Sequence, residues 1–390
     1  MADHPQYFCQ FATIHSDWPW LRQTEDGRGT MGGVLFALAP QPAAELPSPA
    51  QTETWLVVFD EAPAGFCTTV PRERRILFVT EPPEIKKYPR SYLAQFGTVV
   101  SPYDFRSVER RSMVLGNPCL NWHFGVSRVD GRYSSKFGTL DELRHLPVPQ
   151  KIDLVSVICS NKTATEAQRA RLALVCLLKE HLGDVLHVYG RGFNPVDDKM
   201  SAIAPYKYHV VLENNLLPHF WTEKLSDAWL GWSLPLYLGA PNLGTVCPAA
   251  GFVPLPAGAP EDCVRVVIQA LESQLWESRQ AELALCRRWI LETTNVFATA
   301  ARMLAAAPEY SRKQPVLAKP EVIFGVSRAD VAAMHSQARS HSVVRSCEGN
   351  KPSAQQGHEY TPARNNRGHA RLQCRRTFAG GHGFHSHADV

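Results

Sequence analysis

The chain has 390 residues, of which 20% are charged and 44% hydrophobic, and its formal net charge at neutral pH is +4. This composition is typical of a globular protein and excludes a fibre or a wholly disordered chain. Ten cysteines are scattered along the sequence without a C-x-x-C pair. Their spacing favours free thiols in a reducing compartment over disulfides or a structural zinc site.

The N-terminal residues carry Asp3 and His4 and lack the basic start and apolar core of a signal peptide. The most apolar runs of the chain fall well short of the ~20 residues that a membrane-spanning helix needs. We therefore expect a cytoplasmic protein that does not span a membrane.

Continuous apolar runs mark the first half of the chain. Residues 55–59 and 76–79 are apolar without alternation, which is typical of strands buried on both faces. Residues 98–100 form another candidate strand, and the runs end in acidic or proline-rich sequence. A less regular stretch follows, so we place an N-terminal α/β domain at residues 1–150.

From residue 151 onward, strand-like and helix-like segments alternate. Such alternation predicts a doubly wound parallel sheet, whose ligands bind at the carboxyl ends of the strands. Strands are expected over residues 154–159, 185–189, 206–212 and 234–238, and helices over residues 165–181 and 222–232. One or two long helices over residues 261–304 complete an expected C-terminal domain of residues 151–310.

Residues 311–390 form the third expected region, a low-complexity basic tail. From residue 336 the chain carries eight Lys and Arg against three Asp and Glu, a formal net charge of +5. Because the whole chain carries +4, residues 1–335 carry a net charge of −1. Its few apolar residues predict disorder. Because the remainder is nearly neutral, no nucleic acid is expected as a partner. The tail could contact anionic lipids at the inner face of the membrane, or be an inert terminus.

A polar pair ends the expected strand over residues 206–212. Glu213 and Asn214 directly follow its last apolar residue. Carboxylate and amide oxygens at a strand's carboxyl end can accept hydrogen bonds from ribose or sugar hydroxyl groups. A turn or a helix cap is an equal alternative for this segment by itself, because asparagine suits both.

The start of the expected helix over residues 222–232 is a second candidate. Thr222 fits the N-cap position, and the free N–H groups of the first turn attract phosphate. Lys224 in that turn opposes the helix dipole, which makes sense if an anion such as a diphosphate binds there. The alternative is an exposed lysine paired with Glu223 or Asp227.

Three blocks in this order resemble the donor-binding core of the α-1,3/1,4-fucosyltransferases, glycosyltransferase family 10. The blocks are residues 206–214, 222–225 and 234–242. Upstream, Ser160-Asn161 followed by Arg171, and the Gly-Arg turn at Arg191, are also similar to family segments. The resemblance is strong over residues 154–255, weaker in the N-terminal domain and absent from the tail.

The resemblance implies a set of donor-binding residues. These are Arg171, Arg191, Glu213, Asn214, Phe220, Thr222, Glu223 and Lys224. Arg171 and Lys224 would bind the diphosphate of the donor, since both carry a positive charge. Arg191 ranks below Arg171, because a Gly-Arg turn can simply pack the end of a strand.

The remaining residues of this set would contact the sugars. By resemblance, Glu213, Asn214 and Glu223 would bind the ribose and the transferred sugar. Phe220 or Trp221 stands where the family often has a tyrosine before Val-Thr-Glu-Lys. This chain therefore lacks that phenolic hydroxyl group at either position.

An inverting transfer also needs a base that takes the proton from the acceptor hydroxyl group. Glu81 follows a continuous apolar strand, and residues 75–81 resemble the family segment that carries the base. Pro82-Pro83 would stiffen this loop. Glu84 is the rival base, whereas His123 lies beside aromatic residues and is expected to be a packed residue.

Together these expectations describe an α/β protein with two facing Rossmann-like domains of the GT-B type and a disordered basic tail. The implied reaction transfers fucose from GDP-fucose to a hydroxyl group of a glycan acceptor with inversion, without a metal or another cofactor. The alternatives are a transferase of the same fold with another nucleotide sugar, and a non-catalytic protein that binds glycans or sugar nucleotides.

Overall fold

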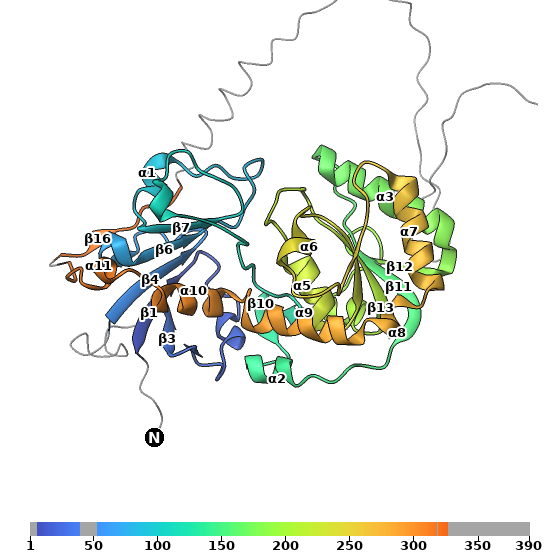
Figure 1. Cartoon of the computed structure of the whole chain (residues 1–390), viewed down its shortest axis with the longest axis horizontal. Helices are drawn as coiled ribbons and strands as arrows, with labels where there is room; N and C mark the ends of the chain where they lie inside the picture. The colour runs from blue at the N-terminus through green and yellow to red at the C-terminus, as the bar shows by residue number, and fades with distance from the viewer. Residues whose placement is uncertain (1–5, 40–52, 318, 327–390) are drawn as a thin grey trace, which may run out of the picture. The chain divides into compact units, whose positions relative to one another are not determined.

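The computed structural model describes residues 6–39, 53–317 and 319–326. Within these ranges the chain forms two mostly parallel sheets with helices packed beside them (Figure 1). The α/β prediction is therefore confirmed. None of the helices in the described ranges is long and apolar enough to cross a membrane.

The first sheet contains seven strands among the described residues. In spatial order they are β2 (Thr30–Met31), β3 (Val34–Leu38), β1 (Tyr7–Ala12), β4 (Glu53–Phe59), β6 (Arg75–Phe78), β7 (Thr98–Ser101) and β8 (Met113–Leu115). All neighbouring strands are parallel except β2 and β3. The strands expected at residues 55–59, 76–79 and 98–100 are confirmed, with ends shifted by a residue or two.

Both faces of this sheet are covered, which explains its continuous apolar runs. On one face Phe11 packs against Phe297 of α10 (Val296–Ala305), with ring centroids 5.0 Å apart. On the other face Tyr92 of α1 (Arg90–Leu93) joins a second buried cluster. Alternate side chains of β4 enter the two clusters, so no polar face remains on that strand.

The second sheet is entirely parallel and carries the expected doubly wound topology. Its order is β12 (Leu186–Tyr189), β11 (Ile152–Ile158), β13 (Tyr206–Leu212), β14 (Leu234–Leu238) and β15 (Val253–Pro254). The chain leaves β11 toward β12 and then returns to the opposite side of β11 as β13. A crevice is expected between the carboxyl ends of β11 and β13, where the winding reverses.

Helices connect the strands of the second sheet. They are α3 (Glu166–Leu182) after β11, α4 (Lys199–Ile203) before β13, α5 (Glu223–Leu230) before β14 and α6 (Leu243–Val246) after it. A capping box at Thr165 and Gln168 begins α3, and Gly183 ends it. The two helices expected from residue spacing in this region, at 165–181 and 222–232, are confirmed with slightly different ends.

The stretch predicted as one or two long helices over residues 261–304 is broken into four helices, so that prediction is wrong. They are α7 (Pro260–Glu272), α8 (Leu275–Ser278), α9 (Gln280–Glu292) and α10. Gln274 adopts a left-handed φ of 48°, which ends the helical path between α7 and α8. Asn295 caps α10 by accepting a hydrogen bond from the Phe297 N–H at 2.9 Å. Apolar spacing by itself does not reveal either break.

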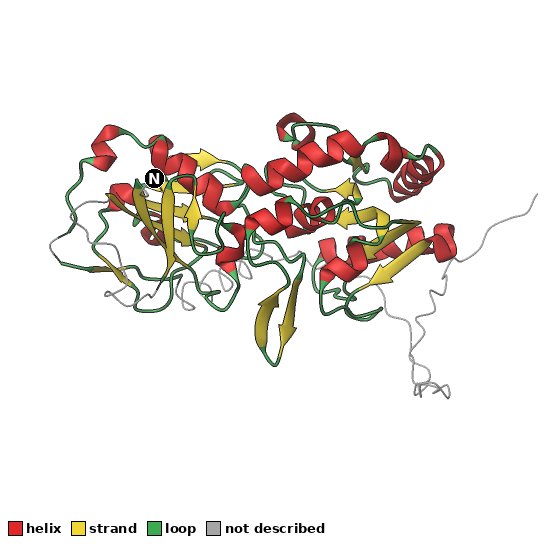
Figure 2. Cartoon of the chain, turned by 90° about the horizontal axis from the view of Figure 1, so that it is seen from below, coloured by secondary structure: helices red, strands yellow, loops and turns green. Residues whose placement is uncertain are grey.

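Shorter elements complete the described chain. The hairpin of β9 (Val126–Val129) and β10 (Arg132–Ser135) projects from the molecule (Figure 2), and α2 (Leu140–Arg144) follows it. After α11 (Glu309–Arg312), β16 (Glu321–Val322) pairs antiparallel with β5 (Cys67–Thr68). The predicted tail from residue 311 thus begins with these elements, and the part of the tail from residue 327 onward is outside the described residues.

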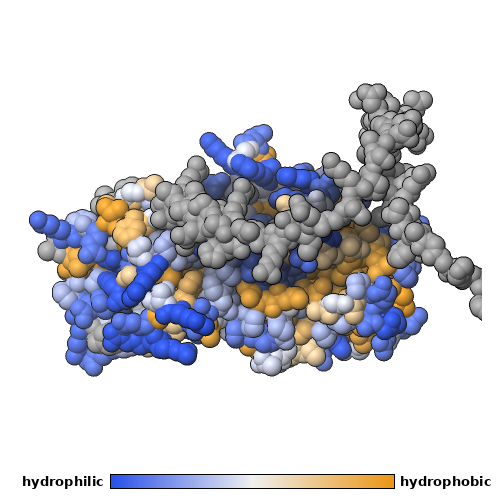
Figure 3. Space-filling model, turned by 90° about the horizontal axis from the view of Figure 1, so that it is seen from above, coloured by the Kyte–Doolittle hydropathy of each residue, from blue (hydrophilic) through white to orange (hydrophobic). Residues whose placement is uncertain are grey.

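Hydrophilic and hydrophobic side chains are interspersed on the face drawn in Figure 3.

Candidate functional site

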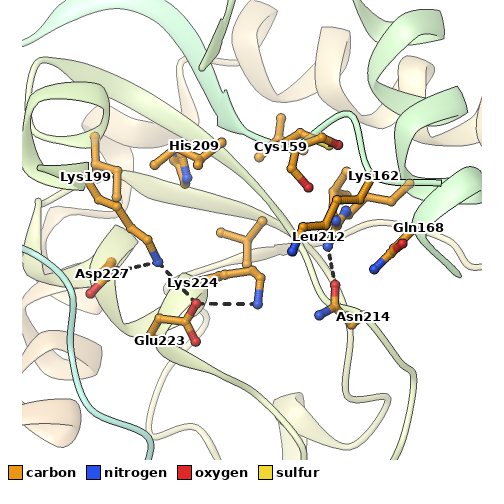
Figure 4. Close-up of a pocket in the computed structure, with 16 residues that line it drawn as sticks. Cys159, Lys162, Gln168, Lys199, His209, Leu212, Asn214, Glu223, Lys224 and Asp227 are labelled. Atoms are coloured by element: carbon orange, nitrogen blue, oxygen red, sulfur yellow. Dashed lines mark hydrogen bonds and ion pairs between the residues drawn. The ribbon is translucent and has the colours of Figure 1, made fainter. Parts of the chain in front are cut away.

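A cavity of about 330 Å³ lies where the topology of the second sheet predicts a ligand crevice. Its lining comes from the end of β11, the first turns of α3, the short helix α4, the end of β13 and the start of α5. Polar and charged side chains point into it from several of these elements (Figure 4). They are Ser160, Lys162, Gln168, Arg171, Lys199, Asn214, Glu223, Lys224 and Asp227.

Two predicted residues from different elements of the cavity lining contact each other. Arg171 lies on α3 and donates a hydrogen bond through Nη1 to Oδ1 of Asn214, which follows β13. The Nε atom of Arg171 is buried and has no hydrogen-bond partner among the described residues. An arginine with donor groups to spare at the rim of a cavity is suited to bind an oxyanion.

Glu213 lies beneath the start of α5 and is saturated by protein partners. Its carboxylate accepts hydrogen bonds from the Thr222 main-chain N–H at 2.7 Å and from Thr222 Oγ1 at 2.7 Å. It also forms an ion pair with Lys224 at 3.3 Å. These contacts position Thr222 and Lys224, and the predicted contact of Glu213 with a ribose or sugar stays a prediction.

Thr222 caps α5 as its sequence position predicts. Its Oγ1 accepts hydrogen bonds from the Lys224 main-chain N–H at 3.3 Å and from Lys224 Nζ at 2.9 Å. Lys224 is therefore held with its ammonium group at the N-terminal end of the helix. The side chain is only 24% exposed, so the exposure expected in the alternative is wrong, whereas the pairing with Glu223 that it also expected is confirmed.

A chain of alternating charges crosses the floor of the cavity. Glu223 Oε1 lies 3.6 Å from Lys224 Nζ and 3.1 Å from Lys199 Nζ, and Lys199 lies 3.4 Å from Asp227 (Figure 4). Burial raises the pKa of Glu223, but Lys199 and Lys224 outweigh it and hold the pKa well below its ordinary value. Burial lowers the pKa of Lys224, but Glu223 and Glu213 keep it above its ordinary value. Both groups are therefore charged at neutral pH.

Sequence reasoning missed several residues of the cavity. Lys162 lies just after the Ser160-Asn161 pair at the end of β11. Its position after a strand end could have predicted it as a residue of the cavity. Lys199 and Asp227 carried no such signal, because one lies on a short helix and the other in the middle of α5. Burial raises the pKa of Asp227 to about 6, although Lys199 opposes this effect.

Four of the predicted donor-binding residues are outside the cavity lining: Glu213 and Thr222, which hold Lys224, and Phe220 and Arg191. Phe220 is only 3% exposed and packs in the protein interior. Arg191 follows β12 with an exposed side chain, and its main-chain carbonyl accepts a hydrogen bond from the Asn161 N–H at 3.0 Å. Their roles in donor binding stay predictions, and the lower rank given to Arg191 agrees with this position.

Glu81 lies just beyond the carboxyl end of β6, in the first sheet, and is half-buried. Burial raises the pKa of Glu81, Asp60 raises it further and Lys86 lowers it. The charges of Glu223 and Lys224 also act on this carboxyl group, in opposite directions. Glu81 thus lies within electrostatic reach of two residues that line the cavity.

The other two acid–base candidates differ from Glu81 in their surroundings. Glu84 is exposed. His123 packs against Trp18, with ring centroids 4.5 Å apart. Burial lowers the pKa of His123 to about 3, so the ring is neutral at physiological pH. The interpretation of His123 as a packed residue is confirmed.

Residues 148–257 match the family model described as glycosyltransferase family 10 (fucosyltransferase), C-terminal. We call residues 148–257 the family 10 segment, after the family model that they match. Every residue that lines the cavity falls within the family 10 segment. The resemblance inferred from the three sequence blocks is therefore confirmed for this part of the chain.

A curated relative is similar to part of the chain. The 3-galactosyl-N-acetylglucosaminide 4-alpha-L-fucosyltransferase FUT3 of Bos taurus is 34% identical over 145 residues, which cover 34% of this chain and 38% of the relative. The chain thus spans well under half the length of that relative. Function is therefore inferred from the family 10 segment and the geometry of its cavity.

Two solved structures are also similar to the chain at low identity. A crystal structure of an alpha1,3-fucosyltransferase is 14% identical with a TM-score of 0.40. The match covers 76% of this chain and 93% of the chain in that structure. A crystal structure of an alpha1,3-fucosyltransferase with GDP-fucose is 13% identical with a TM-score of 0.44. The match covers 82% of this chain and 95% of the chain in that structure.

Proposed function

We propose that this chain transfers fucose from GDP-fucose to a hydroxyl group of a glycan acceptor with inversion at the anomeric carbon. The observation that carries the proposal is the cavity of the family 10 segment, which Arg171, Glu223 and Lys224 line together beside the start of α5. The similar Bos taurus protein is named as a fucosyltransferase, which supports fucose over other sugars.

The diphosphate of the donor would bind at the cationic side of the cavity. Arg171, Lys162 and Lys224 all line it, and the first turn of α5 adds main-chain N–H groups. These groups neutralise the negative charge that grows on the diphosphate as the bond to the sugar breaks. Asn214 and Glu223 are the nearby acceptors for ribose and sugar hydroxyl groups. The proposal needs no metal ion or other cofactor.

Glu81 would act as the base. Its carboxylate takes the proton of the acceptor hydroxyl group while that oxygen attacks the anomeric carbon, and GDP leaves from the opposite face. Burial raises the pKa of Glu81, which makes the carboxylate a stronger proton acceptor than an exposed one. Glu84, the rival, is exposed.

The wider arrangement is proposed with the same reaction. The two sheets would be the two Rossmann-like domains of a GT-B enzyme, with the donor bound by residues 151–310 and the acceptor by residues 1–150. We also propose a cytoplasmic location, with peripheral membrane contact through the basic residues after 336. Those residues lie outside the described part of the chain.

The test is a transfer assay of the purified protein with GDP-fucose, GDP-mannose and UDP-sugars against a panel of glycan acceptors. We expect transfer from GDP-fucose alone. Glu81→Ala should lower turnover by about 10²- to 10⁴-fold with little change in donor affinity, as loss of a general base does. Glu84→Ala is the matched control and should keep most of the activity.

Two results would replace the proposal. Selective turnover of another nucleotide sugar would support a transferase of the same fold with a different donor. Donor binding by calorimetry without turnover of any acceptor, and without effect of Glu81→Ala, would support a non-catalytic binding protein.

A further inference from the structure

A second carboxylate is buried beside Glu81 at the same edge of the first sheet. β4 and β6 are parallel neighbours in which Phe59 pairs with Phe78. Asp60 directly follows β4, and its main-chain N–H donates to the Phe78 carbonyl at 2.9 Å. Asp60 is only 5% exposed. Asp60 and Glu81 therefore leave adjacent strand ends into the same region.

Asp60 is held in an unusual backbone conformation. Its φ is +66°, in the left-handed region that few residues other than glycine adopt. The hydroxyl group of Tyr92 donates to the Asp60 carbonyl at 2.7 Å and secures this conformation. A strained, buried acid that the surrounding structure holds in place often marks a functional position.

Tyr88 connects the two acids. Its hydroxyl group donates to Asp60 Oδ1 at 2.5 Å and accepts the Glu81 main-chain N–H at 3.4 Å. Tyr103 donates to the Glu81 carbonyl at 3.1 Å. Two tyrosine hydroxyl groups thus hold the main chain on both sides of the Glu81 side chain, and one of them is anchored by Asp60.

Lys86 completes the group. Its ammonium lies 2.8 Å from Asp60 Oδ2 and is shared with Glu61. The charged and titratable groups that act on Glu81 or contact its main chain are Asp60, Lys86, Glu223, Lys224, Tyr88 and Tyr103. After burial, Asp60 is the largest cause that raises the pKa of Glu81, and Lys86 opposes it.

We infer that Asp60 is a positioning residue for the reaction proposed above, which holds Glu81 in place through Tyr88 for proton transfer from the acceptor. Asp60 also contributes its charge. A fixed negative charge nearby disfavours ionisation of Glu81 and so strengthens that carboxylate as a base. Asp60 itself does not touch the reacting atoms. The inference rests on the proposed function, because it assigns Glu81 its role.

The test is the pH profile of kcat/KM for Asp60→Asn. Asparagine has the same shape, tolerates a positive φ and can still accept from Tyr88, so only the charge changes. Removal of this charge lowers the pKa of Glu81, so the base is ionised at lower pH. We expect the acid limb of the profile to move to lower pH by roughly half a unit or more, with a lower maximal rate.

Two companion variants separate charge from position. Tyr88→Phe keeps the charge of Asp60 and removes both hydrogen bonds, so kcat should fall roughly ten- to hundredfold while donor affinity is unchanged. Glu61→Gln is the matched control. Glu61 is an acid that pairs with Lys86 as Asp60 does, whereas the Tyr88 hydroxyl group donates to Asp60. Its acid limb should coincide with that of the wild type.

The outcomes distinguish this inference from the proposed function. A wild-type protein that transfers no fucose overturns the proposed function. An NMR titration of the Glu81 carboxyl group, assigned with Glu81→Gln, then still measures the effect of Asp60→Asn. An unshifted Glu81 titration in Asp60→Asn, or a wild-type kcat in Tyr88→Phe, overturns the inference. If Asp60→Asn does not fold, Tyr88→Phe decides by itself.

Discussion

Lys224 has two roles at the residue scale, one structural and one in ligand binding. Its ammonium is paired with Glu213 and Glu223, yet it also lines the cavity. The two carboxylates keep it charged, because they hold its pKa above the ordinary value. A bound diphosphate would therefore meet a cation that is already ordered, which reduces the entropy lost on binding.

Replacement of Lys224 by methionine should weaken GDP-fucose binding by about 10- to 100-fold, the equivalent of about 1.5–3 kcal/mol for a charge-assisted contact. Calorimetric titration measures this change. Arg191→Met is the matched control, since its side chain is exposed and outside the cavity lining. Equal losses in the two variants would contradict the ranking of these cations.

The start of α5 is the element on which the site depends. Thr222 caps the helix, and its hydroxyl group also donates to the buried carboxylate of Glu213. The cap thus joins the end of β13 to the start of α5, and both carry residues that line the cavity. A strand end and a helix start are held together by one side chain.

Thr222→Val should lower the free energy of unfolding by about 2 kcal/mol, because the helix loses its cap and Glu213 loses a buried donor. It should also weaken donor binding. Thr139→Val is the control, since Thr139 caps α2 in the same way by accepting from the Glu142 N–H at 3.1 Å and does not line the cavity. Thr139→Val should lower the free energy of unfolding by about 1 kcal/mol and leave donor binding unchanged. Urea denaturation measures the stability of both variants, and calorimetric titration measures their donor binding.

At the scale of the whole molecule, side chains from one part of the chain bind the main chain of another. Asn295 Nδ2 donates to the Gln23 carbonyl at 2.6 Å. Arg22 donates to the Trp122 carbonyl at 2.8 Å, and Asn117 donates to the Trp221 carbonyl at 2.8 Å. Such bonds satisfy buried main-chain groups that regular secondary structure leaves unpaired.

Asn295→Ala should lower the free energy of unfolding by about 2–3 kcal/mol, because it removes the cap of α10 and the bond to Gln23. Asn295→Ser keeps a capping oxygen and lacks the amide, so it should recover part of that loss. Urea unfolding of the three proteins measures both effects. Stability of Asn295→Ala within about 0.5 kcal/mol of the wild type would show that this bond contributes little.

Much of the second sheet could be predicted from the sequence. β13 and β14 begin and end at the expected residues, because each is rich in aromatic and aliphatic residues and has polar residues or glycine at its end. Asn214, Glu223, Lys224 and Arg171 were expected together, and all four line one cavity. Parallel strands bring their carboxyl ends to one edge, so chain order was enough to group these side chains.

Only the tertiary structure decided the partners of these residues. Lys199 pairs with Glu223 although 24 positions separate them, and Asp60 meets Tyr88 across 28 positions. Local sequence patterns record the period of a helix or strand but not which distant side chain lies opposite. The sequence by itself thus determined the elements and the edge where the site forms. Packing decided which charges surround Glu223 and Glu81, because burial and distance set their strength.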